Sequence, residues 1–123
     1  MSNLVHFAQK IYQEMTKVHP ESYLEANTAQ EVKYPYQTYT FSSEDLELGS
    51  EGFYLDVDIY DEGTSYMGIL GVENSLKKAL DRHNLMTDEA YFRFRFDGSN
   101  SIPTQKDDLK RRNVRFYIKI YWR

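Results

Sequence analysis

The sequence predicts an α+β two-layer sandwich, in which a four-stranded, mostly antiparallel sheet carries helices packed on one face. Segments that alternate between apolar and polar residues indicate strands with one buried face and one wet face. Two further segments show the spacing of amphipathic helices, and one of them separates the second strand from the third. The 123 residues fit one domain, spanning residues 1–123, with the element order α-β-β-α-β-β.

The first helix is expected after an N-cap at Ser2 or Asn3, and Pro20 stops it. Its buried stripe recurs at helical spacing, at Leu4, Val5, Ala8, Ile11, Tyr12, Met15 and Val18. Residues 21–31 are mixed in character and are expected to form a loop.

Two strands follow this loop. Residues 32–41 are rich in β-branched and aromatic side chains, and Pro35 favours the start of a strand or an edge. Residues 53–60 alternate cleanly and bury Phe53, Leu55, Val57 and Ile59. The acidic segment 42–52 between these strands is expected to be a loop or a hairpin arm.

A second helix is expected after a cap at Thr64 or Ser65, with one buried stripe formed by Ile69, Val72, Leu76, Ala79 and Leu80. The third strand covers residues 90–97 and buries Phe92, Phe94 and Phe96, after which residues 98–101 are expected to turn. The last strand buries Val114, Phe116, Ile118, Ile120 and Trp122.

Composition excludes several classes of protein. The net charge of −4 attracts no nucleic acid, and the arginines between the phenylalanines of the third strand do not fit an aromatic RNA-binding strand. The chain has no cysteine, which excludes disulfides and thiolate sites and fits a reducing cytosol. It shows neither a signal peptide nor the run of about 20 apolar residues that a membrane span needs, so no membrane partner is expected.

The outward positions of the strands carry complementary charge. Asp56 and Asp58 on the second strand would form ordinary cross-strand ion pairs with the basic residues of neighbouring strands, namely Arg93, Arg95, Arg115 and Lys119. The alternative is that Asp56, Asp58 and Asp61 bind a divalent cation in a small metal-dependent hydrolase. Histidine pairs and a nucleophile elbow are missing, so we assign no catalytic residue, no metal ligand and no cofactor.

Four segments carry a resemblance to a known family. They are Tyr34-Pro35-Tyr36, the strand from Leu55 to Asp61, the helix after it, and the ending from Asp108 through Tyr121. In this order they resemble the tail-completion proteins of long-tailed bacteriophages and prophages, a family that includes tail terminators and head-to-tail joining proteins.

The resemblance implies a non-enzymatic structural protein of the virion, made in the bacterial cytoplasm and located at the head-tail interface. Such proteins form rings, usually hexamers, at the head-proximal end of the tail tube. The implied partners are therefore other copies of the chain, the tail tube protein and the head-tail connector. A protein-binding adaptor outside any virion is a further alternative.

A ring needs two different patches on each subunit, because head-to-tail contacts are heterologous. The candidate residues for a subunit interface are Tyr54, Tyr60, Arg93, Arg95, Arg115, Tyr117 and Lys119. The acidic segment offers Glu44, Asp45, Glu47 and Glu51, which would face the tube lumen and repel DNA or contact a partner. Both groups of residues also fit an ordinary solvated surface.

Overall fold

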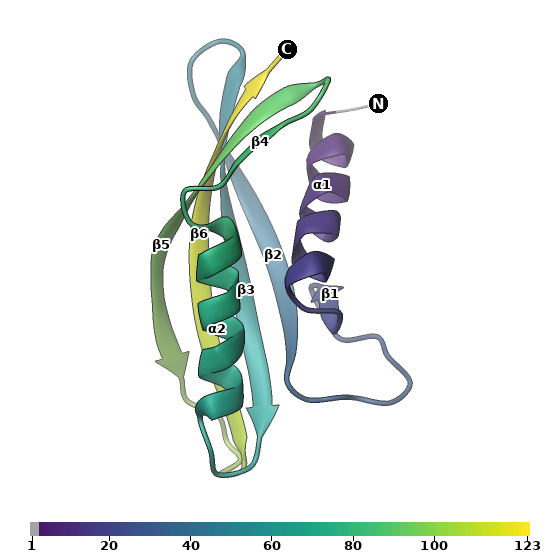
Figure 1. Cartoon of the computed structure of the whole chain (residues 1–123), viewed down its shortest axis with the longest axis vertical. Coiled ribbons are helices and arrows are strands. Elements are labelled where there is room, and N and C mark those ends of the chain that lie inside the picture. Colours follow the sequence, from purple (N-terminus) through teal and green to yellow (C-terminus); the bar gives the residue numbers. More distant parts are fainter. Residues whose placement is uncertain (1–2) are drawn as a thin grey trace.

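The computed structural model describes residues 3–123 (Figure 1). Ser2, one of the two expected N-caps, lies outside the described residues. The elements in chain order are α1 (Asn3–Val18), β1 (Ser22–Leu24), β2 (Tyr36–Asp45), β3 (Ser50–Glu62), α2 (Met67–Leu80), β4 (Asn84–Met86), β5 (Ala90–Ile102) and β6 (Leu109–Trp122).

The sheet differs from the expected one: it has six strands, not four, and it is mixed. The strand order is β1-β2-β3-β6-β5-β4, and β1 runs parallel to β2. Both additional strands are three residues long and lie at the edges of the sheet, where they form by pairing with a longer neighbour. Three residues are too few to show alternation, so the prediction of a loop over residues 21–31 and of four strands was wrong. The overall α+β character is correct.

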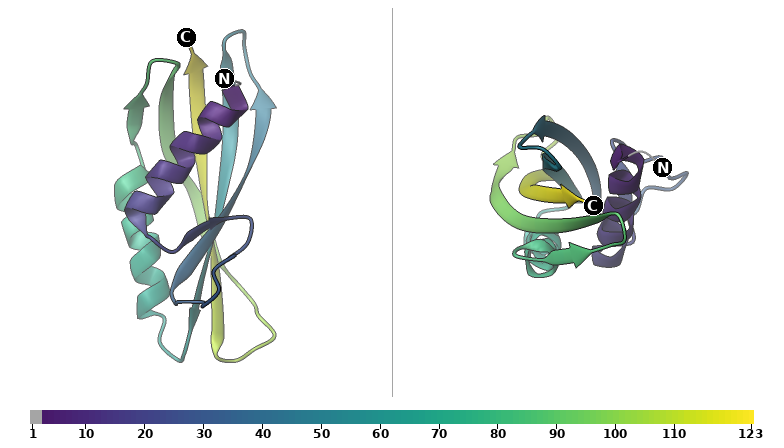
Figure 2. Two further views of the ribbon diagram at one scale, coloured as in Figure 1. Left: turned by 90° about the vertical axis from the view of Figure 1, so that its right-hand side faces the viewer. Right: turned by 90° about the horizontal axis from the view of Figure 1, so that it is seen from above.

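The sheet is strongly twisted and curls into a half-barrel, and both helices lie on the same side of it (Figure 2). This agrees with the expected placement of the helices on one face. Within residues 3–123, neither helix is both long and apolar enough to cross a membrane.

The long strands continue past their predicted C-terminal ends, although β2 begins at Tyr36 and not at residue 32 as expected. The acidic segment 42–52 is mostly a hairpin, because β2 continues to Asp45 and β3 begins at Ser50. β5 continues through residues 98–101, which were expected to turn. The register shifts between Phe96 and Gly98, and Gly98 has φ +135°, so this glycine accommodates a bulge within a strand.

One apolar core lies between the helices and the sheet. Phe7 of α1 stacks on Phe53 of β3 with ring centroids 3.8 Å apart, and both side chains are buried. Leu76 of α2 and Phe116 of β6 are buried in the same cluster. The expected inward positions of β5 are confirmed, because Phe92 and Phe94 are buried and Phe96 packs against the core. In α1 the expected stripe was partly wrong, because its members Leu4, Val5 and Tyr12 are exposed. The core therefore fixes both helices against one face of the sheet.

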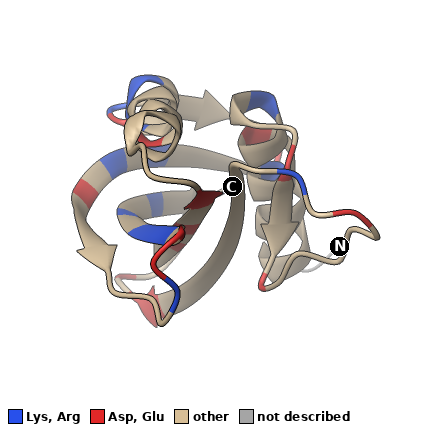
Figure 3. Cartoon of the chain, turned by 90° about the horizontal axis from the view of Figure 1, so that it is seen from below, with Lys and Arg blue, Asp and Glu red and all other residues tan. Residues whose placement is uncertain are grey.

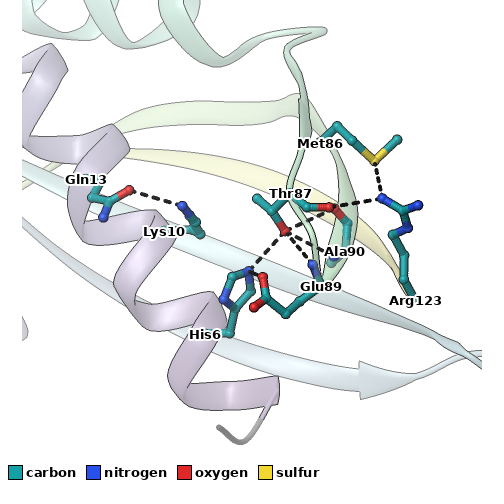
Figure 4. A network of polar contacts seen from close by, with 8 residues as sticks. All are labelled: His6, Lys10, Gln13, Met86, Thr87, Glu89, Ala90 and Arg123. Atoms are coloured by element: carbon teal, nitrogen blue, oxygen red, sulfur yellow. Dashed lines mark hydrogen bonds and ion pairs between the residues drawn. The ribbon is translucent and has the colours of Figure 1, made fainter.

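Polar contacts link the N-terminal part of α1 to the sheet. His6 on α1 forms a hydrogen bond through Nε2 with Thr87 Oγ1 at 3.1 Å, and the Arg123 guanidinium donates to the Thr87 carbonyl at 3.4 Å (Figure 4). α1 is thereby linked to the turn between β4 and β5 and to the end of β6.

The buried carboxylate of Glu73 links α2 to the sheet. It accepts hydrogen bonds from the Arg112 guanidinium and from Ser99 Oγ (3.0 Å), and Lys77 Nζ lies 3.1 Å away. Burial opposes the ionisation of Glu73, but hydrogen bonds from Arg112, Lys77 and Ser99 outweigh it and lower the pKa of this carboxyl below 4.5. Ionised Glu73 therefore stabilises the fold.

We predict that Glu73→Gln lowers the free energy of unfolding by about 1–3 kcal/mol at pH 7, because it removes charge-assisted hydrogen bonds. A carboxyl whose pKa is lower in the folded state stabilises the fold at pH values above its unfolded-state pKa. This stabilisation is lost as the pH falls through the folded-state pKa. The difference between wild type and variant should therefore shrink as the pH falls through the folded-state pKa of Glu73. Urea titrations at pH 7 and pH 3 measure this difference, with the exposed Glu31→Gln as control. An equal difference at both pH values would contradict the assignment.

Candidate functional site

The face of the sheet opposite the helices is polar and uncovered within residues 3–123; we call it the open face. It follows from the alternation of β3, β5 and β6, which sends every second side chain away from the core. Its main side chains are Tyr54, Asp56, Asp58, Tyr60, Arg93, Arg95, Arg111, Asn113, Arg115, Tyr117, Lys119 and Tyr121. Viewed from below, charges of both signs lie on the curled sheet and on its connecting loops (Figure 3).

Acidic and basic side chains of β3 and β6 pair across the open face. Arg111 Nη2 lies 3.0 Å from Asp58 Oδ2, and Asn113 Nδ2 donates to Asp58 Oδ1 at 3.2 Å. Arg115 Nε lies 3.6 Å from Asp56 Oδ1. The hydrogen bond to Asp58 is the main cause that raises the pKa of Arg111. The expected complementary charge is therefore present between these two strands, where it supports their register.

This pairing bears on the metal-site alternative. Asp56 and Asp58 each face a guanidinium group, so their oxygens are engaged by fixed cations. Within residues 3–123, no three acidic, histidine or cysteine side chains are grouped so that they could hold a metal ion. The arrangement is that of a cross-strand ion-pair ladder.

The arginines of the open face also stack on tyrosines. The Arg115 guanidinium carbon lies 4.0 Å from the centroid of Tyr54, and that of Arg95 lies 5.0 Å from the centroid of Tyr117. The two tyrosine rings are themselves 5.0 Å apart. Such cation–π contacts restrict long side chains and prepare them for a partner at low entropic cost.

A pocket of about 440 Å³ opens on the β4 side of this face; we call it the basic pocket. Four of its lining residues are cations, and none is acidic: the lining comprises Arg82, Asn84, Arg93, Phe94, Arg95, Tyr117 and Lys119. Arg82 reaches it from the connection between α2 and β4, where its φ is +58°. The pocket therefore combines four positive charges with the ring of Tyr117.

The acidic residues lie around the opposite hairpin, whose residues 44–51 we call the hairpin tip. Tyr117 OH donates to Glu44 Oε1 at 3.0 Å, and Glu47 Oε1 lies 3.9 Å from Lys119 Nζ. Glu51 instead accepts a hydrogen bond from Trp122 Nε1 at 2.7 Å. Its register partner Ile120 points into the core, so Glu51 lies on the helix side and is separated from Glu44.

The structure brings most of the interface candidates together. All except Tyr60 occupy three consecutive cross-strand rows, which contain Tyr54, Arg93, Arg95, Arg115, Tyr117 and Lys119. Tyr60 lies two rows further along the strands, where it stacks on Tyr36 at 4.9 Å. Arg93 and Arg95 are not beside the aspartates, because β6 lies between β3 and β5.

Sequence analysis missed two groups of residues. Arg111 pairs with Asp58, and the alternation that identified Arg115 also contained it. Arg82 and Asn84 line the basic pocket, but they precede or belong to a strand too short to show a pattern. No signal in the sequence pointed to these two.

Tyr117 and Tyr121 should ionise at different pH values, because Tyr117 is hydrogen-bonded to a carboxylate and Tyr121 to cations. Burial, followed by the hydrogen bond to Glu44, raises the pKa of Tyr117 to about 12. The hydrogen bond with Lys119, followed by that with Arg93, lowers the pKa of Tyr121 below 10.0. We predict that NMR titration of the tyrosine ring carbons shows Tyr121 ionising first and Tyr117 last, with Tyr→Phe variants assigning the signals. The reverse order would contradict the described charge distribution.

Comparison with known proteins gives a structural likeness only. No protein-family model and no curated protein matches the sequence. Among solved structures, a chain in the virion of a native gene transfer agent (GTA) particle has a similar fold, with a TM-score of 0.71. The match covers 90% of this chain and 91% of that chain, at 11% sequence identity. The chain therefore shares its fold with a protein of that particle.

Proposed function

We propose that the chain is a structural protein of a phage-like virion that caps the head-proximal end of a tail tube and joins it to the head connector. The observation that carries this proposal is the fold similarity to a chain of a gene transfer agent virion, which extends over nine-tenths of both chains. The resemblance of the four sequence segments to tail-completion proteins, described above, supports the same role independently.

The open face supports assembly and not turnover of a substrate. Its carboxylates are held by arginines, and its arginines are stacked on tyrosines. Tyrosine and arginine are the residue types enriched in protein interfaces, because they bring a large contact area together with a polar group. We therefore retain the rows around Tyr54, Arg95 and Tyr117 as the candidate subunit contact of a ring, with six copies as the expected number.

The hairpin tip had two expected roles, facing the tube lumen or contacting a partner. Leu48 at its end is fully exposed, and Leu46 is more than one-third exposed. Exposed leucines do not contribute to the repulsion of DNA, whereas a protein contact buries them favourably. We therefore assign the hairpin tip to a protein contact.

Particles that lack this protein test the proposal. We expect electron microscopy to show tails longer than those of the parent, because nothing ends polymerisation of the tube, and few heads attached to them. A copy of the gene supplied in trans should restore the parental tail length. Tails of normal length joined to heads in the absence of the protein would contradict the proposed role. Normal tails without heads would restrict the role to joining.

A further inference from the structure

The basic pocket holds guanidinium groups that have no carboxylate partner in the same chain. Within residues 3–123, no carboxylate lies within ion-pair distance of Arg82, Arg93 or Arg95. Lys119 alone among the four lining cations has one, the exposed Glu47 at 3.9 Å. Three neighbouring positive charges repel one another, so an anion between them is stabilising. In a chain with a net charge of −4, this pocket is built for an acidic ligand.

One side of the basic pocket is aromatic, because the ring of Tyr117 lies under the Arg95 guanidinium and lines the pocket. Phe94 also lines the pocket, but its side chain is only 3% exposed and belongs to the core. A ligand with an apolar group beside its negative charge can contact both the arginines and the Tyr117 ring. Free phosphate or a nucleic-acid backbone provides the charge alone.

The hairpin tip has this combination of groups. Leu48 is fully exposed at the end of the hairpin, and Glu47 beside it has a side chain that is 76% exposed. Asp45 and Leu46 are also exposed. The tip is the turn of the β2–β3 hairpin, at one end of the long axis of the molecule (Figure 1). It presents an apolar side chain flanked by carboxylates.

The hairpin tip and the basic pocket lie at the same height along the strands and on the same open face, where Glu47 of the tip is 3.9 Å from Lys119 of the pocket lining within one chain. One cross-strand row runs from Glu44 in β2 through Gly52, Lys119 and Arg93 to Asn84 in β4. Copies in a closed ring are related by rotation without translation along the ring axis. Complementary patches at one height therefore meet between neighbours when the strands run along that axis.

We propose that the hairpin tip of one copy docks into the basic pocket of the next copy. Leu48 contacts the ring of Tyr117, while the carboxylates of Asp45 and Glu47 pair with the arginines of the pocket. The contact is heterologous, as a ring requires, and it replaces the weak exposed pair between Glu47 and Lys119 within one chain. The inference rests on the proposed function for the ring that this contact closes.

Engineered cysteines test the contact directly, because the chain has none of its own. Leu48→Cys in one preparation is mixed with Asn84→Cys in another under oxidising conditions, so that only contact between two copies joins the tip to the pocket rim. The control mixes Leu48→Cys with Asn74→Cys, which places the thiol at an exposed position on α2. We expect at least about tenfold more disulfide-linked heterodimer from the first pair, given the strength of interfacial charge pairs. An equal yield from both pairs would overturn the proposal.

Charge-reversal variants in the same assay distinguish specific docking from nonspecific association or loss of folding. Adding Arg93→Glu and Arg95→Glu to the pocket variant should reduce the cross-linking to the control level. Adding Asp45→Lys and Glu47→Lys to the tip variant should do the same, and mixing the two charge-reversed proteins should restore it. Failure to restore it, with both proteins folded by circular dichroism, would refute the contact. Loss of cross-linking on addition of short duplex DNA, with DNA binding that requires Arg93 and Arg95, would assign the pocket to nucleic acid instead.

The outcomes distinguish this contact from the proposed function. Specific cross-linking together with normal, head-attached tails in particles lacking the protein would leave the contact standing and refute the tail role. Overlong tails in those particles, with no specific cross-linking, would support the tail role and refute the contact.

Discussion

The antiparallel pairing of β3 with β6 determines both faces of the sheet at once. The register that places Leu55 opposite Phe116 in the core also places Asp56 opposite Arg115 on the open face. A slip of one residue would move the apolar set into water and the charges into the core, so the pairing is strongly specified. These are the longest strands together with β5, and the helices, the ion-pair ladder and the basic pocket are all built on them.

The division of the sheet into a covered and an open face explains the character of the candidate surface. Both helices are used to bury one face, and Phe7 and Leu76 fill the space between them and the strands. The other face is stabilised by ion pairs and by arginine–tyrosine stacking, so it is ordered without being covered. This order is what the proposed contact between identical copies uses, because side chains that are already held lose little freedom when a partner binds.

The periodic elements could be predicted from the sequence, and the features set by tertiary pairing could not. The buried stripe of α2, apart from the exposed Ala79, and the phenylalanines of β5 were identified because each covers several periods. The stripe of α1 was misplaced, since Leu4, Val5 and Tyr12 are exposed and Phe7 is buried instead. β1 and β4 were missed because three residues carry no period, and the bulge at Gly98 was mistaken for a turn. The strand order was also unknown, so Arg93 and Arg95 were expected beside the aspartates of β3 when β6 in fact separates them. The basic pocket depends on this order and on Arg82, which arrives from the end of α2.

The central claim is that the open face binds further copies of the chain, and Arg95 on this face lines the basic pocket and stacks on Tyr117. Sedimentation equilibrium over a wide concentration range, on wild type and on Arg95→Glu, tests it most directly. Lys78→Glu, at an exposed position on α2, carries the same change of charge and serves as control. We predict a closed oligomer for wild type and the control, and self-association weaker by about tenfold or more for Arg95→Glu. Equal self-association of all three proteins, or a wild type that stays monomeric throughout, would contradict the account.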